Sequence, residues 1–222
     1  MTTTVFLHAF PLDGRMWETQ VGRFGGIAPT LYALGGPSLE EWARAVLRRV
    51  EGDVALVGSS MGGYAALEAA RLAPERVKAL VLVGSRADAD SRERRTARDD
   101  TIRLIRERGV QALWEEMRPR LFSEAAPADV VARARTIALD QRPEQLVRAT
   151  EAMRDRADSS ETLRSFASRL LVVVGGDDPF VSPRDFDGLV PPERLNVIDG
   201  ASHLVSMERP DVFNDLLEKV LA

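Results

Sequence analysis

The sequence Val54-Ala-Leu-Val-Gly-Ser-Ser-Met-Gly-Gly-Tyr64 decides the fold of this chain of 222 residues. Its apolar first part, Val54 to Val57, predicts a fully buried β-strand, and the run that begins at Ala65 predicts an α-helix. Between them Gly58-Ser-Ser-Met-Gly62 is a G-x-S-x-G pattern in a strand–turn–helix context. Glycines without Cβ atoms allow a turn tight enough to hold Ser60 in a strained conformation. We expect the Ser60 hydroxyl to stand clear of the sheet as a nucleophile; the alternative is a serine that only caps the helix.

Strand-like runs alternate with helical runs on both sides of this turn. Besides the strand before Ser60, the apolar runs predict strands at 3–8, 29–34, 77–83, 170–174 and 195–198. Helices are expected from a capping box at Ser38 to about Val50, and from Pro210 to Leu221. Such alternation indicates the α/β class, with a mostly parallel sheet of about six strands and helices on both faces.

The middle of the chain has a different sequence pattern. From about residue 86 to residue 160 strand-like runs are absent, charges of both signs alternate, and apolar residues fall at helical spacing. The pattern predicts three amphipathic helices, at 101–117, 127–140 and 143–156. We therefore expect a helical cap at 87–160, inserted into a core formed by 1–86 and 161–222.

Composition excludes several classes of function. A net charge of -4 argues against general nucleic-acid binding, and the absence of cysteine excludes disulfides and thiolate metal sites. Two distant histidines make a metal site unexpected, and without a phosphate-binding or dinucleotide motif we expect no cofactor. No apolar stretch reaches the length of a membrane span, and the chain opens on a strand-like run without a signal peptide, so a cytoplasmic protein without a membrane partner is expected. The oligomeric state stays open.

Reactive side chains follow several of the predicted strands. The strand ends offer His8, Ser60, the neighbours Asp177 and Asp178, and His203. In open α/β sheets ligands bind outside the carboxyl ends of the strands. A serine hydroxyl becomes a good nucleophile when a base takes its proton and a third group orients that base. The chain order Ser, Asp, His matches one of the known triad folds, with either aspartate as the acid.

These motifs resemble those of the α/β-hydrolase superfamily, and the resemblance covers essentially the whole chain. The matching segments are His8-Ala-Phe-Pro11, Gly58-Ser-Ser-Met-Gly62, Gly175-Gly-Asp-Asp178 and Gly200-Ala-Ser-His203 with Glu208-Arg-Pro210. They are similar to the oxyanion loop, the nucleophile elbow, the acid turn and the histidine segment of that family. The chain looks most like its small capped ester and lactone hydrolases, such as 3-oxoadipate enol-lactonases and pimeloyl-carrier-protein methyl esterases.

The resemblance implies a role for each matching residue. Ser60 would attack a carbonyl, His203 would accept its proton and return it to the leaving group, and Asp178 would hold the imidazole. Asp178 is preferred to its neighbour because it is third after the first glycine, as in the family's turn. The backbone N–H groups of Phe10 and Met61 would form the oxyanion hole.

Other residues have supporting roles. His8 is expected to brace the oxyanion loop. Trp17 and Trp42 are expected in the core. The cap residues that could line a substrate pocket are Trp114, Phe122 and Met153.

The function that follows is hydrolysis of a small carboxylic ester, thioester or lactone through an acyl-enzyme, without a cofactor. One alternative is a carbon–carbon bond hydrolase or lyase with the same triad. Another is a ligand-binding receptor of the same fold with little turnover.

Overall fold

Five of the apolar runs form the strands of one parallel sheet, in the order β1-β2-β3-β4-β5. They come from a computed structural model that describes residues 2–221. The strands are β1 (Thr2–Leu7), β2 (Asp53–Ser59), β3 (Val77–Val83), β4 (Leu170–Gly175) and β5 (Leu195–Ile198). The predicted α/β class with a parallel sheet is confirmed, with five strands instead of six.

The predicted strand at 29–34 was wrong. Extended pairing occurs earlier, where Ile27 forms an isolated bridge with Val5 of β1. Pro29 has no N–H group with which to continue a ladder, and Leu31–Ala33 form a 3-10 helix. The Leu31 N–H donates to the imidazole of His8 instead of a strand carbonyl. β1 is therefore the outer strand of the sheet on this side.

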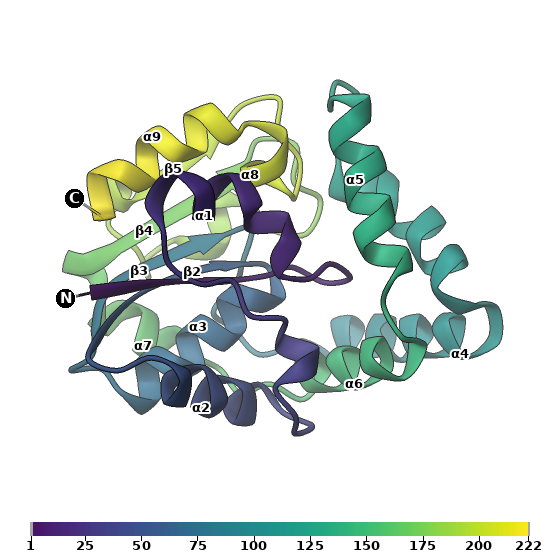
Figure 1. Cartoon of the computed structure of the whole chain (residues 1–222), viewed down its shortest axis with the longest axis horizontal. Helices are drawn as coiled ribbons and strands as arrows, with labels where there is room; N and C mark the ends of the chain where they lie inside the picture. The colour runs from purple at the N-terminus through teal and green to yellow at the C-terminus, as the bar shows by residue number, and fades with distance from the viewer. Residues whose placement is uncertain (1, 222) are drawn as a thin grey trace.

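Helices cover both faces of the sheet. In Figure 1 α2, α3 and α7 lie on one face, and α1, α8 and α9 lie on the other. The helices are α1 (Glu18–Phe24), α2 (Leu39–Arg49), α3 (Met61–Leu72), α4 (Arg92–Leu121), α5 (Ala128–Leu139), α6 (Pro143–Arg154), α7 (Ser160–Ser165), α8 (Val205–Glu208) and α9 (Pro210–Leu221). Across residues 2–221, no helix has both the length and the apolar character needed to cross a membrane.

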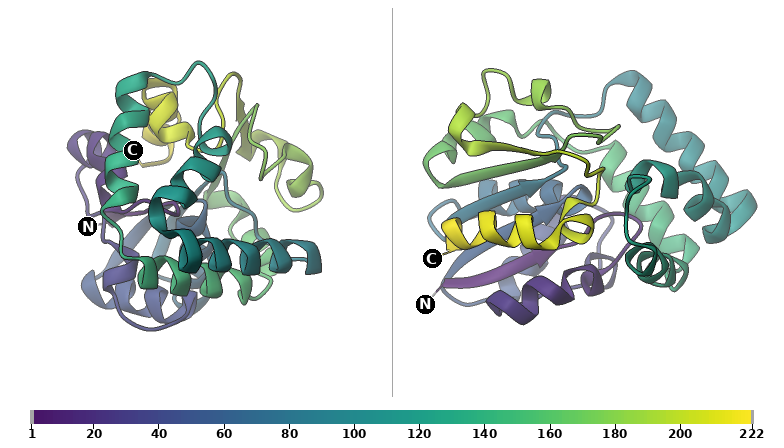
Figure 2. Two further views of the ribbon diagram at one scale, coloured as in Figure 1. Left: turned by 90° about the vertical axis from the view of Figure 1, so that its right-hand side faces the viewer. Right: turned by 90° about the horizontal axis from the view of Figure 1, so that it is seen from above.

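Helices α4, α5 and α6 stand beyond the carboxyl ends of the strands (Figures 1 and 2). The predicted helix at 101–117 was wrong in its bounds, because α4 begins at Arg92 and is broken in its middle. The break is at Gly109, whose φ of 75° lies in the region that favours glycine. The division into a core and a cap at 87–160 stays a prediction, although the three helices fall inside those bounds.

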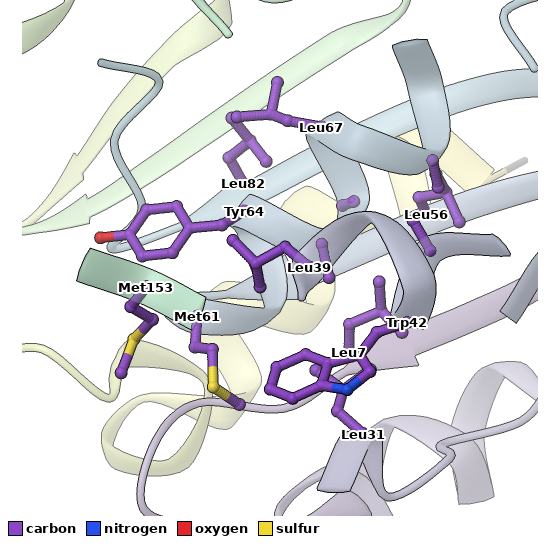
Figure 3. Close-up of a cluster of buried hydrophobic side chains, with 14 of the residues drawn as sticks. Leu7, Leu31, Leu39, Trp42, Leu56, Met61, Tyr64, Leu67, Leu82 and Met153 are labelled. Carbon is purple, nitrogen blue, oxygen red and sulfur yellow. The ribbon is translucent and has the colours of Figure 1, made fainter. Parts of the chain in front are cut away.

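Alternate strand residues pack into two apolar clusters, one on each face of the sheet. From β1, Val5 and Leu7 join the first cluster, whereas Phe6 joins the second. Figure 3 shows part of the first cluster, in which Leu56 of β2 and Leu67 of α3 are buried together. Because both faces are covered, the strands are apolar on both sides, and their carboxyl ends are left to form a site.

Candidate active site

The turn after β2 holds Ser60 in an unusual backbone conformation. Its φ is 50° and its ψ is -115°, and it is the one non-glycine with positive φ among residues 2–221. Its N–H donates to the carbonyl of Val83 at 2.8 Å. A Cβ atom on Gly62 would lie 2.0 Å from the Leu7 carbonyl oxygen, and one on Gly58 would lie 2.4 Å from the carbonyl oxygen of Gly62. The two glycines of the pattern therefore allow the close packing that supports the strained serine.

The structure brings Ser60, His203 and Asp178 together in one hydrogen-bonded relay. Nε2 of His203 lies 2.8 Å from Oγ of Ser60, and Nδ1 lies 2.8 Å from Oδ2 of Asp178. The carboxylate accepts, so Nδ1 carries the proton and Nε2 is free to accept from the serine hydroxyl. Oδ1 of Asp178 accepts from the backbone N–H groups of Phe180 and Val181. We call these three residues the relay.

Burial separates the two candidate acids. The side chain of Asp178 is fully buried, with an exposed fraction of 0%, and that of His203 is 5% exposed. Asp177 is exposed on the same turn. The carboxylate that meets the imidazole is that of Asp178.

A buried carboxylate ties the histidine loop to the end of α4. Oε1 of Glu208 accepts from the Ser202 N–H at 2.9 Å, and Oε2 accepts from the N–H and the hydroxyl of Ser123 at 3.0 and 2.6 Å. The Leu204 N–H donates to the Leu121 carbonyl at 3.1 Å. Both chain neighbours of the imidazole are thus tied to the last residue of α4 or to the segment that follows it. Glu208 belongs to the sequence motif Glu208-Arg-Pro210, but this contact with Ser123 was not predicted from the sequence.

His8 is a buried, neutral side chain at the start of the predicted oxyanion loop, His8-Ala-Phe-Pro11. Its Nδ1–H donates to the Ala9 carbonyl at 3.1 Å, and its Nε2 accepts from the Leu31 N–H at 2.9 Å. Burial lowers the pKa of His8 from 6.5 to about 4, so the ring is neutral at pH 7. Through these two hydrogen bonds, His8 connects the loop that contains Phe10 to the segment that contains Leu31.

The two predicted oxyanion donors lie in the loop after β1 and at the turn after β2, where α3 begins. Met61 follows the serine at the first position of α3, where amide groups lack intrahelical acceptors. Phe10 lies in the loop after β1. In the part of the chain that the structure describes, neither backbone N–H donates to another residue.

A cavity of about 150 Å³ borders Phe10 and Phe180, whereas none of the three relay residues is among the described residues that line it. Phe180, on its wall, stacks edge-on against the imidazole of His203, with ring centroids 4.8 Å apart. The wall combines apolar and charged side chains from the loop after β1, from α3 and α4, and from the loops after β3 and β4. They are Phe10, Tyr64, Arg86, Asp90, Arg94, Ala97, Arg98, Thr101, Leu113, Glu116, Met117, Arg120 and Phe180.

The three cap residues predicted to bind substrate lie elsewhere. Trp114 and Phe122 pack against each other in the second apolar cluster, with ring centroids 6.4 Å apart. Met153 belongs to the first cluster, together with Met61 and Tyr64 (Figure 3). None of the three borders the cavity. Helical spacing shows that these residues form apolar helix faces, and in the structure those faces pack against other buried side chains instead of lining the cavity.

The wall residues beside the relay were missed. Phe180 is two residues after the acid, so its position in the acid turn was a usable signal. Arg120 lies in a stretch of mixed charge, where no pattern separates it from its neighbours. Among the described residues, no group of three or more His, Asp or Glu side chains is arranged to hold a metal ion.

Comparison with known proteins places this chain in a family. The profile of the Alpha/beta hydrolase family matches residues 4–216, so the chain belongs to that family and is a hydrolase of this fold. A thermophilic esterase from Thermogutta terrifontis, solved with malate bound, is 29% identical, with a TM-score of 0.89 over 100% of this chain and 91% of that one. An enol-lactonase from Burkholderia xenovorans LB400 is 21% identical, with a TM-score of 0.77 over 100% and 92%, which is a likeness of fold.

Sequence similarity reaches esterases as well. The pimeloyl-[acyl-carrier protein] methyl ester esterase of Aromatoleum aromaticum is 34% identical over 90 residues, which span 36% of this chain and 36% of that protein. The predicted resemblance to the superfamily, and to its esterases and lactonases, is confirmed.

Proposed function

We propose that this protein is a serine esterase that cleaves a small carboxylic ester, thioester or lactone through an acyl-enzyme. The observation that carries the proposal is the relay, in which both imidazole nitrogens lie 2.8 Å from their partners. In this scheme Ser60 attacks the carbonyl while His203 takes the hydroxyl proton. The imidazolium then gives that proton to the leaving alcohol, and water repeats the steps to release the acid.

The surroundings of the relay support these steps. The carboxylate of Asp178 stabilises the imidazolium that forms and keeps its Nδ1 protonated. The unpartnered N–H groups of Phe10 and Met61 would receive the negative charge of the tetrahedral intermediate. A cap formed by α4, α5 and α6 would shape the cavity and exclude water. The similarity to the Thermogutta terrifontis esterase supports an ester as the substrate, and hydrolysis of a carbon–carbon bond by the same relay stays the alternative.

Hydrolysis of p-nitrophenyl acetate and butyrate tests the nucleophile. The wild type should turn over, and Ser60→Ala should lose about three or more orders of magnitude in kcat. The matched control is Ser59→Ala, at a buried serine outside the relay. Equal rates for the wild type and Ser60→Ala would overturn the assignment. A stoichiometric burst without turnover would favour the receptor alternative.

The acid is tested by a matched pair of neighbours. Asp178→Asn should lower kcat by up to about four orders of magnitude, because an amide favours the wrong imidazole tautomer. Asp177→Asn, at an exposed position, should stay near the wild-type rate. A larger loss for Asp177→Asn would exchange the two roles.

A further inference from the structure

The cavity beside the relay is rich in positive charge. Four arginines and two acids line it, the acids being Asp90 and Glu116. Asp90 has a side-chain exposure of 0% and lies 2.6 Å from Arg156, 3.1 Å from Arg98 and 3.4 Å from Arg94. This single carboxylate therefore faces three guanidinium groups, and two of those groups belong to the cavity wall.

A third wall arginine is also paired. Arg86 meets Asp88 at 2.8 Å and Asp185 at 2.6 Å. Asp88 also meets Arg94. The arginines at 86, 94 and 98 are thus held by carboxylates of the protein itself.

Arg120 differs from the other wall arginines. Within residues 2–221 its guanidinium has neither an ion pair nor a hydrogen bond, and Glu116 one turn earlier does not pair with it. Its guanidinium carbon lies 4.2 Å from the ring centroid of Phe180, which stacks against His203 at 4.8 Å. The distance from the guanidinium carbon of Arg120 to the ring centroid of His203 therefore cannot exceed the sum of these two distances.

The backbone of Arg120 is fixed next to the relay. Its carbonyl accepts from the hydroxyl of Ser202 at 3.2 Å. The following residue, Leu121, accepts from the Leu204 N–H, so hydrogen bonds on both sides of the imidazole hold the end of α4. Stacking on the Phe180 face leaves the edge of the guanidinium, which carries its N–H donors, free to bind an anion. The fold therefore fixes the backbone from which this charge extends, and its guanidinium carbon lies 4.2 Å from the Phe180 ring centroid.

We propose that Arg120 binds a carboxylate carried by the substrate, so that the protein prefers half-esters of short dicarboxylic acids over neutral esters of the same length. This inference rests on the esterase function proposed above. A guanidinium binds a carboxylate through two parallel N–H···O bonds, and Arg120 is the wall arginine whose charge no carboxylate of the described residues pairs, which favours an anion over a neutral group. Glu116 opposes this binding, but it does not form an ion pair with Arg120.

Two series of methyl esters test the proposal. Monomethyl esters of succinate through suberate are compared with neutral methyl esters of the same chain lengths, by titrating the acid released. The wild type should prefer the anionic series at one or more lengths. Arg120→Gln should lower kcat/KM for those esters about 10- to 100-fold, mainly by raising KM, and leave neutral esters within about twofold. Arg120→Lys should restore part of the loss.

The control is Arg118→Gln, at an exposed arginine of the same helix that does not border the cavity. It should leave both series unchanged. Equal kcat/KM of the wild type and Arg120→Gln for anionic esters, or an equal loss in Arg118→Gln, would overturn the inference while the esterase function stands. If neither series is hydrolysed, the proposed function fails, and calorimetric binding of adipate decides the inference separately. Binding weakened at least tenfold by Arg120→Gln would support it, and binding equal in both proteins would overturn it.

Discussion

Replacing Glu208 with glutamine tests whether the buried carboxylate positions the histidine loop. Glu208 is 3% exposed, and its two oxygens accept from three donors, which are the Ser202 N–H and the N–H and hydroxyl of Ser123. A carboxylate matches this set because it only accepts. A glutamine amide has one oxygen and an NH₂ group that donates. In either orientation the NH₂ group faces at least one of these donors.

The magnitude follows from the number of donors left unpaired. One or two buried donors lose their acceptor, each at about 1–3 kcal/mol, so the free energy of unfolding should fall by about 2–4 kcal/mol. For a chain of this size that corresponds to a drop in Tm of roughly 5–15 °C. Because Ser202 is next to the imidazole, kcat should also fall by about 10- to 100-fold through a displaced His203.

Thermal unfolding and p-nitrophenyl butyrate hydrolysis measure both effects. Glu124→Gln, an exposed substitution of the same kind one residue from Ser123, should change neither quantity. Ser123→Ala combined with Glu208→Gln should cost less than the sum of the two single changes, because the pair interacts directly. An unchanged Tm and an unchanged kcat in Glu208→Gln would refute the reasoning.

Three further changes probe other parts of the fold. His8→Asn tests the buried histidine. The pKa of His8 is about 4 in the folded chain, below its ordinary value of 6.5. As the pH falls, the unfolded chain therefore binds a proton at His8 before the folded chain does, and the folded state loses stability. The wild type should lose about 2 kcal/mol more than the variant between pH 7 and pH 5, measured by urea unfolding; parallel curves would contradict this. Gly84→Ala and Gly188→Ala both place a side chain at positive φ, so each should lower the free energy of unfolding by about 1 kcal/mol. Only Gly84→Ala should also lower kcat, because its added Cβ would lie 3.0–3.1 Å from atoms of His203 and Asp178. Asp90→Asn should lower the unfolding free energy by about 3–5 kcal/mol, because it leaves the buried Arg156 and the partly buried Arg98 without their carboxylate. Asp100→Asn breaks an exposed pair and should cost less than about 1 kcal/mol, and similar losses for both would refute the argument.

Features governed by near neighbours in the chain were predictable from the sequence. The strand at Val77–Val83 and the helix at Pro210–Leu221 have the bounds that their apolar patterns predicted. The turn at Ser60 was predictable because its requirements, a buried strand, two glycines and a helix start, lie within about a dozen residues. Ser38 caps α2 by accepting from the Glu41 N–H, as the capping box predicted.

Features that depend on distant partners were decided by the tertiary structure. The choice of Asp178 over Asp177 depends on which carboxylate faces a histidine 25 residues away, and the relay closes between side chains 143 residues apart. The segment 29–34 has strand-like composition, but Leu31 finds its acceptor in His8.

The cavity wall depends on tertiary structure for the same reason. A helical pattern shows which residues of the cap are apolar, but not whether they face the cavity or a neighbouring helix, so Trp114 and Met153 were indistinguishable from pocket residues. Arg120 is one of many arginines in the sequence, and its separation from the carboxylates that hold the others exists only once the elements are packed. Local sequence fixes backbone conformation through short-range sterics and hydrogen bonds, whereas burial and charge pairing depend on which distant segments meet.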